Sequence, residues 1–301
     1  MRDRMSDSDA VSGYVDAGTR HGVKLVDGQG IKWVNGAEVL ATMAPQFREN
    51  LGDPSRVHEL MAKYWLRPLW VDPETTRRID HVRTDPGYQD LSEAYHESVE
   101  EALFLDGRVT LSAEGELAAG DYFWRPPGWV HSAGSVTGFE CLLMMEGDDA
   151  TEGSGRVSRV VRDDEEAGQY AMESPAGRAN PTIGPRGYVR RLETRFLPTE
   201  RHDDAQTRLV GPEAGPLSGR VLSRNVRTGG ASVLVEIPAG WQSLVPAVDR
   251  ERFLVIVNGS VTVDGQKLSA CSLVRIAAGS DGPHLSTHQQ ARMLVKVGSR
   301  R

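Results

Sequence analysis

This chain of 301 residues contains a diverged internal repeat, and the repeat limits what the chain can fold into. The segments EALFLDGRVTL (residues 101–111) and RFLVIVNGSVTV (residues 252–263) superpose with Gly107 on Gly259. Each is followed by a turn, a further strand-like run and a corner that contains Pro or Gly. Internal similarity at a long spacing indicates a duplicated structural unit. The sequence therefore predicts two related β-barrels in tandem and not one large sheet.

The distribution of apolar runs divides the chain into four parts. Residues 1–66 form a short mixed α/β N-terminal extension, of which residues 1–13 are expected to be disordered because they are charged and rich in small side chains. Residues 67–147 and 188–301 carry short Val-, Leu- and aromatic-rich runs separated by Gly, Pro or Asp, which is typical of antiparallel barrels. Residues 148–187 are polar and rich in Gly, Pro and acids, so we interpret them as a linker or long excursion.

Composition and charge exclude several kinds of partner. The net charge is −7 and the arginines are scattered among acids, which argues against nucleic acid. No apolar run approaches the roughly 18 residues of a membrane helix, and the N-terminus lacks the apolar core of a signal peptide. Cys141 and Cys271 both lie in apolar, strand-like runs, which predicts free thiols in a reducing compartment. We expect a cytoplasmic protein with no membrane partner.

A motif with fixed spacing follows the first copy of the repeat. In GDYFWRPPGWVHS, Gly120 is followed by five residues, Pro126, one residue, Gly128, two residues and His131. These four positions match the second sequence motif of the cupin superfamily, and the chain resembles that family. The resemblance implies an all-β fold of two tandem cupin barrels, also described as double-stranded β-helices or jelly rolls. It extends over about residues 67–147.

The first cupin motif is filled only in part. It consists of a glycine, five residues, His-x-His, three or four residues, a glutamate, six residues and a glycine. His96, Glu100 and Gly107 fit the second histidine, the glutamate and the closing glycine. Ala94 stands in place of the first histidine, and the opening glycine, at position 87, is one residue out of register.

The second repeat keeps the spacing of the first motif and none of its ligands. Between Gly240 and Gly259, the three ligand positions hold Pro246, Val248 and Arg252. The four positions of its second motif are assigned, in order, to Ala270, Ile276, Ala278 and Asp281. Arginine at a ligand position would repel a cation. The resemblance thus implies a bicupin with one metal-competent N-terminal barrel and one degenerate C-terminal barrel.

The first barrel is expected to hold one divalent metal ion. Residues 94 and 96 share one face of a strand because side chains alternate with a period of two, Glu100 opens the next strand, and His131 approaches from a third. His96, Glu100 and His131 form a 2-His-1-carboxylate set, which leaves coordination positions open. Fe(II) is the expected ion, and Mn, Ni or Zn are alternatives. A bulge in the strand would let Glu93, Tyr95 or Glu97 replace the missing ligand.

Other residues are assigned to the pocket or to the surface. Ala94 and Phe104 are expected to line the substrate pocket, together with Trp124 and Trp129, for which simple filling of the barrel is an equal alternative. Glu101 should face away from Glu100 as an exposed charge. Arg125 could bind a substrate carboxylate, but an ion pair at the surface is favoured. The catalytic residues are not identified by the sequence.

Three classes of function fit these residues. The favoured class is a mononuclear non-haem iron oxygenase of the dioxygenase kind acting on a small organic substrate. The alternatives are a non-redox metal-dependent lyase, isomerase or cyclase, and a non-catalytic cupin that binds or senses a small ligand. A three-ligand set kept in one barrel and lost in the other favours an enzyme. Apolar strand faces in the C-terminal barrel could pack on the first barrel or form a homodimer.

Overall fold

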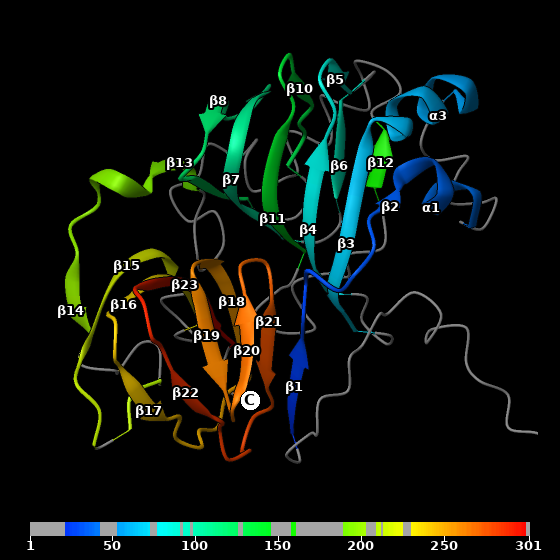
Figure 1. Ribbon diagram of the computed structural model, residues 1–301. Helices are drawn as coiled ribbons and strands as arrows, with labels where there is room; N and C mark the ends of the chain where they lie inside the picture. The colour runs from blue at the N-terminus through cyan, green and yellow to red at the C-terminus, as the bar shows by residue number, and fades with distance from the viewer. Residues whose placement is uncertain are drawn as a thin grey trace, which may run out of the picture. The chain divides into compact units, whose positions relative to one another are not determined.

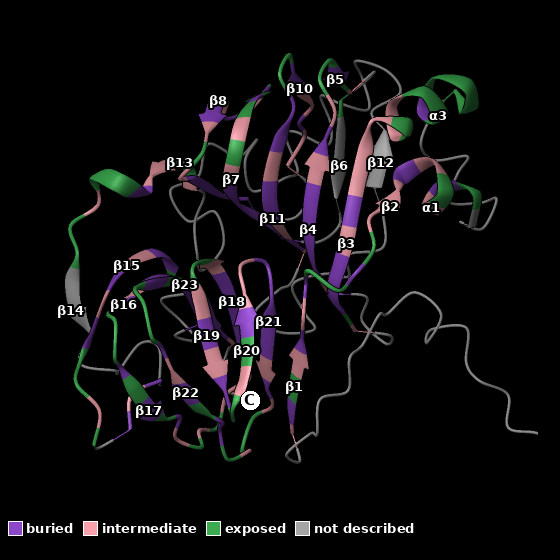
Figure 2. Cartoon of the chain, in the orientation of Figure 1, coloured by how far each residue is buried: buried purple, intermediate pink, exposed green. Residues whose placement is uncertain are grey.

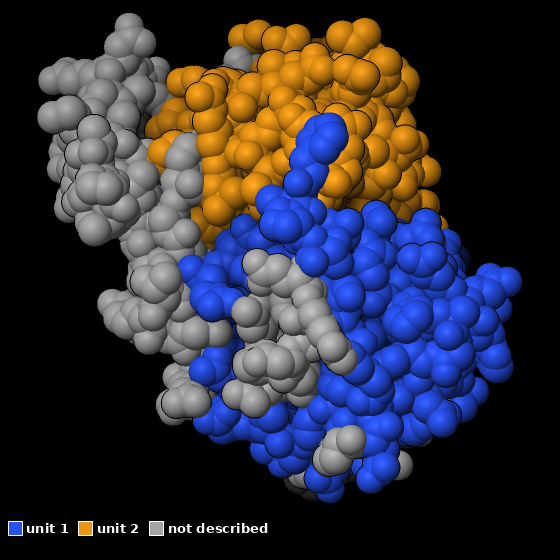
Figure 3. All heavy atoms as spheres, turned by 90° about the vertical axis from the view of Figure 1, so that its left-hand side faces the viewer, with its two compact units in different colours: residues 1–32, 196–301 blue, residues 33–195 orange. Residues whose placement is uncertain are grey.

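The structure is a computed structural model that describes part of the chain. The described residues are 22–42, 53–72, 77–90, 93–96, 99–125, 129–145, 158–160, 189–202, 209–211, 213–224 and 230–298, and the side chains of 42, 94–96, 158–160 and 200–202 are outside this description. The chain divides into two compact units, drawn in different colours in Figure 3. We call residues 33–195 the N-terminal unit, and residues 1–32 together with 196–301 the C-terminal unit.

The N-terminal unit is built around one large antiparallel sheet. Its strands follow the order β13-β9-β7-β11-β4-β3-β2, and β7, β11, β4 and β3 lie side by side in Figure 1. The bounds of these strands are β13 Val189–Glu193, β9 Asp121–Arg125, β7 Glu100–Leu111, β11 Phe139–Met145, β4 Arg78–Thr84, β3 Tyr64–Val71 and β2 Val34–Asn35. Shorter strands complete the unit: β5 Tyr88–Gln89, β6 Ala94–His96, β8 Gly115–Ala118, β10 Ala133–Ser135 and β12 Ser158–Val160.

The period of two along these strands creates the core of the N-terminal unit. Ala102 and Phe104 on β7 face the same side as Phe123 on β9, and they pack with residues of β3, β4 and β11 in one cluster. Phe104 contacts Phe139 in an edge-to-face arrangement with ring centroids 5.7 Å apart. The sheet therefore has an inner face that is mostly apolar.

Two helices lie between β2 and β3 in the described part of the N-terminal unit. They are α1 (Gly36–Thr42) and α3 (Pro54–Ala62). The Asp53 carboxylate caps α3 by accepting a hydrogen bond from the Ser55 amide at 2.9 Å, and Pro54 occupies the first helical position. Most of α3 is exposed, and Val57 is its one buried residue (Figure 2). None of the described helices is long and apolar enough to span a bilayer.

The C-terminal unit consists of two sheets that enclose an apolar core. One has the order β1-β21-β18-β23-β16-β15-β14 and the other has the order β17-β22-β19-β20. Both contribute to the core, with Leu254 and Val233 from the first and Val261 and Leu285 from the second. The bounds are β1 Val23–Val26, β14 Glu200–His202, β15 Leu217–Arg224, β16 Ala231–Ile237, β17 Gln242–Leu244, β18 Arg252–Asn258, β19 Ser260–Val263, β20 Gln266–Ser269, β21 Leu273–Ile276, β22 His284–Ser286 and β23 Ala291–Val297. A 3₁₀ turn, Thr194–Phe196, follows β13.

The fold class is all-β, as the sequence indicates, but the expected boundaries differ from the observed units. Residues 1–66 do not form one extension, because β1 pairs with β21 of the C-terminal unit whereas β2 pairs with β3 of the N-terminal unit. Within the expected linker, β12 pairs with β6, so part of this segment adds to the first barrel. The rest of residues 148–187, and residues 1–13, lie outside the described residues.

The two copies of the repeat have matching geometry. Gly107 and Gly259 both adopt positive φ angles, 72° and 79°, at the bend after the first half of the repeated segment. Glu100 pairs with Arg125 in the first copy, and Arg252 pairs with Ile276 in the second. These strand pairs place Glu100 and Arg252 at equivalent positions, as the superposed motifs predict.

The assignment of the second motif needs a correction of one residue. The Gly120 amide donates to the Phe104 carbonyl, and the equivalent bond in the second copy is from the Cys271 amide to the carbonyl of Ile256. Cys271, with φ of 62°, is therefore the counterpart of Gly120, not Ala270. The second copy has a turn one residue shorter after the bend, which is why counting from the sequence shifts the match. Ile276 then corresponds to Arg125 and not to Pro126.

Candidate metal centre

Glu100 opens β7 at a buried position. The glutamate has 6% of its surface exposed, and it lies directly across from Arg125 of the neighbouring strand β9. Its side chain is on the same face as Ala102 and Phe104, because these residues follow at intervals of two. The carboxylate therefore points to the inner side of the sheet, beside the apolar core.

His131 approaches Glu100 from the segment that leads into β10. Its Nδ1 lies 2.9 Å from the carbonyl oxygen of Trp129, and a carbonyl can only accept, so Nδ1 carries the proton. The other ring nitrogen, Nε2, is 3.6 Å from Glu100 Oε2. Nε2 is thus the ring nitrogen that faces the carboxylate, and 8% of the residue is exposed.

The two side chains fit a divalent metal ion. A backbone carbonyl that holds the other ring nitrogen is the usual support of a metal-binding histidine, because it fixes the tautomer and the ring orientation. Metal bonds to nitrogen and oxygen of about 2.0–2.2 Å allow one ion to contact two atoms that are 3.6 Å apart. The donor set of imidazole and carboxylate suits first-row divalent ions.

The expected third ligand, His96, is described for its backbone but not for its side chain. The backbone of Ala94–His96 forms β6 and pairs with β12, with His96 opposite Ser158, but the side chains of Ala94, Tyr95 and His96 are not described. Among the described side chains, no three His, Cys, Asp or Glu groups gather around one point. Of the alternative ligands, Glu93 is exposed and Glu97 lies outside the described residues.

Arg125 is a buried part of this site, which corrects the expectation of a surface ion pair. Its guanidinium Nη1 is 3.1 Å from Glu100 Oε2, and its Nη2 donates a hydrogen bond of 3.1 Å to Glu114 Oε2. Only 2% of the arginine is exposed, and the Glu114 side chain is fully buried in the turn between β7 and β8. Alternation along β9 places Arg125 on the same inward face as Phe123, and this was the signal in the sequence that could have identified it.

A second polar pair on this face was not recognised from the sequence. The Tyr88 hydroxyl donates to Asp90 at 2.8 Å, and Asp90 also accepts from the amide of Ala133, two residues beyond His131. Burial raises the pKa of the Asp90 carboxyl, and the bond from Tyr88 opposes that shift. Burial also raises the pKa of the Tyr88 hydroxyl well above its usual value, so this hydroxyl keeps its proton. The pair holds β5 against the segment that carries His131.

The aromatic residues assigned to the pocket have different positions. Phe104 lies on the inner face with Glu100, as expected, and it is part of the core cluster. Trp124 is buried, but it pairs with Glu101 on the opposite face of the sheet, so it does not line the space beside Glu100. Trp129 is half-buried and supports His131 through its carbonyl oxygen.

Glu101 is not the exposed charge that the sequence suggests. It does face away from Glu100, but it is completely buried and accepts a hydrogen bond from the Tyr122 hydroxyl. Sequence alternation correctly separates the two carboxylates onto two faces. It does not show that both faces of this sheet are covered.

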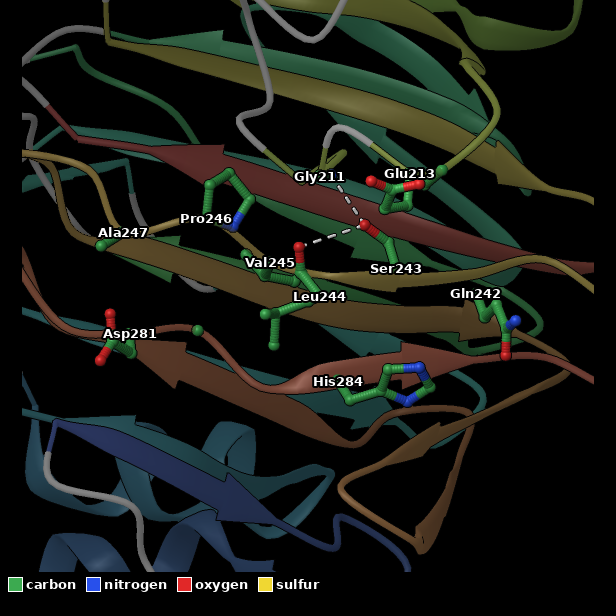
Figure 4. Close-up of a pocket in the computed structure, with 12 residues that line it drawn as sticks. Gly211, Glu213, Gln242, Ser243, Leu244, Val245, Pro246, Ala247, Asp281 and His284 are labelled. Atoms are coloured by element: carbon green, nitrogen blue, oxygen red, sulfur yellow. Dashed lines mark hydrogen bonds between the residues drawn. The ribbon is translucent and has the colours of Figure 1, made fainter.

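The equivalent positions of the C-terminal unit hold no set of metal ligands. Arg252, at the position of Glu100, is completely buried and donates to the carbonyl of Pro246 at 2.9 Å. A pocket of about 710 Å³ lies in this unit (Figure 4). Its lining includes Ser243, Leu244 and His284, and in the close-up the Ser243 hydroxyl bonds to the Gly211 amide. The pocket contains none of the predicted metal ligands.

Comparison with known proteins identifies the fold. Residues 55–149 match the model of the ChrR Cupin-like domain family. A candidate dioxygenase from Nostoc punctiforme has a similar structure, with a TM-score of 0.65 and 14% identity over 92% of this chain and 83% of that one. The bacterial pirin YhhW from Escherichia coli, solved in complex with nickel(II), has a TM-score of 0.53 and 11% identity. The match covers 93% of this chain and 100% of that one.

A further solved structure matches nearly the whole chain. Protein YlbA from Escherichia coli has a TM-score of 0.53 and 12% identity, and the match covers 98% of both chains. No curated protein is similar enough in sequence to match. At these identities the structural likenesses establish the fold alone. The family match shows that residues 55–149, which carry Glu100 and His131, form a cupin-like domain.

Proposed function

We propose that this protein is a metal-dependent cupin enzyme that acts on a small organic substrate, and that His96, Glu100 and His131 hold its one divalent ion. The observation that carries the proposal is the orientation of the His131 ring. Its Nδ1 is committed to the Trp129 carbonyl, while its Nε2 faces the buried Glu100 carboxylate at 3.6 Å. A ring held by a backbone carbonyl at one nitrogen, with the other nitrogen facing a buried carboxylate, is the arrangement in which histidines hold metal ions.

Mononuclear non-haem iron oxygenase chemistry is the favoured activity. A bound ion of this kind supplies Lewis-acid or redox chemistry at its open coordination positions. The chain itself supplies the surroundings. Phe104, Phe123 and Phe139 form an apolar wall that excludes water, and the Tyr88–Asp90 pair holds the segment beyond His131. The likeness to a candidate dioxygenase supports this choice, whereas the nickel(II) complex of a similar fold supports a divalent ion without selecting iron.

The first test is the metal content of the full chain. We expect about one equivalent of a divalent ion in the protein after incubation with Fe(II), Mn(II), Ni(II) or Zn(II) and removal of excess ion. His131→Ala should lose most of this metal and keep its circular dichroism spectrum, since the core lies in the apolar strands. His284→Ala is the matched control, because His284 is exposed in the C-terminal unit. Full occupancy in His131→Ala would falsify the site.

Oxygen consumption separates the favoured activity from its alternatives. The iron-loaded protein should consume oxygen in the presence of its substrate, which can be sought among small organic acids, ketones and phenols. Turnover without oxygen uptake would replace this activity with non-redox metal catalysis. Saturable binding without turnover would identify a binding or sensing module instead.

A further inference from the structure

Arg125 occupies an unusual position between two buried carboxylates. Its bond to Glu114 is an aligned hydrogen bond of 3.1 Å. Its contact with Glu100, also at 3.1 Å, is an ion pair, and among the described residues Nη1 has no aligned hydrogen-bond acceptor. The guanidinium carbon lies 4.2 Å from the centroid of the Phe123 ring, which fixes the plane of the group from one side. Arg125 is thus hydrogen-bonded to Glu114 and ion-paired with Glu100.

The charges of these three groups depend on one another. Glu100 and Glu114 contribute −2 and Arg125 contributes +1, so the group as a whole carries −1 before any metal binds. Because all three side chains are nearly or fully buried, solvent screens them little. A metal ion at Glu100 and His131 would therefore be repelled by the Arg125 charge and attracted by the Glu114 charge.

The described part of the C-terminal unit has no counterpart of Glu100, Arg125 or Glu114. Arg252 stands at the position of Glu100, and Ile276 at the position of Arg125. The turn that carries Glu114 has three residues, 112–114, whereas its counterpart has only Asp264 and Gly265. The Asp264 carboxylate accepts from the His284 amide instead. The unit that lost the metal ligands thus also lacks the arginine and the carboxylate that anchors it.

We propose that Arg125 is a positioning residue that competes with the metal ion for the Glu100 carboxylate, and that Glu114 limits this competition by holding the guanidinium. The inference rests on the proposed function, because it requires that Glu100 bind the metal. Glu114 then acts on the metal through Arg125, although it is not a ligand. Removing the Glu114 charge should weaken metal binding, and removing the guanidinium should strengthen it.

The test measures the affinity of the full chain for Mn²⁺ alone, from the electron paramagnetic resonance signal of free Mn²⁺ after the protein has been stripped with a chelator. Glu114→Gln keeps an acceptor for Arg125 but loses the charge, and we expect its affinity to fall by about tenfold or more. Arg125→Met should raise the affinity by about tenfold. The double variant restores a net charge of −1 without the guanidinium, and it should bind within about threefold of the wild type.

Recovery of affinity in the double variant is the decisive result. A merely structural role for Arg125 predicts that the double variant binds as weakly as Glu114→Gln or more weakly, and that outcome overturns the inference. If Arg125→Met alone does not fold, the comparison of Glu114→Gln with the double variant still decides. His131→Ala serves as the control. If it loses Mn²⁺ while the Arg125 and Glu114 variants match the wild type, only the inference fails. If the wild type binds none of Mn²⁺, Fe(II), Ni(II) and Zn(II), the proposed site itself fails; if it binds one of the other ions but not Mn²⁺, the same variants are compared with that ion.

Discussion

At the scale of single residues, the site depends on which atoms of its polar groups are already engaged. The Nδ1 of His131 donates to the Trp129 carbonyl, which turns Nε2 toward Glu100, and Asp90 secures the segment beyond it by accepting from the Ala133 amide. Burial, with a smaller contribution from the Glu100 charge, raises the pKa of the Cys141 thiol well above its usual value. Cys141 therefore remains a neutral thiol in the core and does not compete as a thiolate ligand.

The alanine at position 94 gives a residue-scale prediction. If the missing histidine leaves a coordination position that oxygen or substrate needs, Ala94→His should bind metal at least as tightly as the wild type and lose activity. Metal titration and turnover of the same preparation check this. Tighter binding with unchanged or improved activity would mean that the vacancy is simple decay. Coordination by Glu93, Tyr95 or Glu97, seen in a metal-bound crystal structure, would rule out both interpretations.

At the scale of elements, the bend in β7 sets the positions of Glu100, at the start of this strand, and of Glu114, in the turn that follows it. The strand pairs with β11 and β9 before Gly107 and with β8 and β10 after it, so one strand serves two parts of the barrel. A Cβ at Gly107 would lie 2.2 Å from the Gly138 carbonyl oxygen, a backbone atom that cannot move aside. Glycine is therefore required here by both conformation and space.

Substitutions of two glycines separate these two requirements. Gly115→Ala introduces a side chain at φ of 90° with nothing within 4 Å, and it should cost about 1 kcal/mol of unfolding free energy. Gly107→Ala adds a backbone clash to a similar conformational strain, so its cost should be about 3 kcal/mol or more. Urea denaturation of both variants measures the difference. Equal losses would show that the strand relaxes around the new methyl group.

At the scale of the whole molecule, the order of segments in the chain differs from the order of structural units. Residues 1–32 belong with residues 196–301, and the entire N-terminal unit is inserted between them. The link is β1, which pairs with β21 over four residues and adds Val23 to the C-terminal core. The C-terminal unit is therefore complete only when the beginning of the chain is present.

Two substitutions in β1 test this organisation. Val23→Asp places a carboxylate in the core of the C-terminal unit, where Val23 is 3% exposed, and it should cost about 3 kcal/mol or more. Lys24→Asp puts the same side chain at the neighbouring exposed position, and it should cost about 1 kcal/mol or less. Hydrogen exchange of the β21 amides, followed with urea denaturation, reports the effect. Unchanged β21 protection in Val23→Asp would mean that β1 is not part of this sheet.

The sequence by itself determined the repeated barrels and the meeting of Glu100 with His131. The faces and bends of the strands follow from local rules, because alternation of side chains sets the faces of a strand and glycine spacing sets its bends. The meeting of Glu100 with His131 was implied by the match to the two cupin motifs. Only the tertiary structure decided the partners of Arg125 and the place of β1. Glu114 reaches Arg125 through the β7–β8 turn, and Val26 pairs with Leu273 from the far end of the chain. Such contacts depend on how whole strands pack against one another, and a local sequence pattern does not specify this packing.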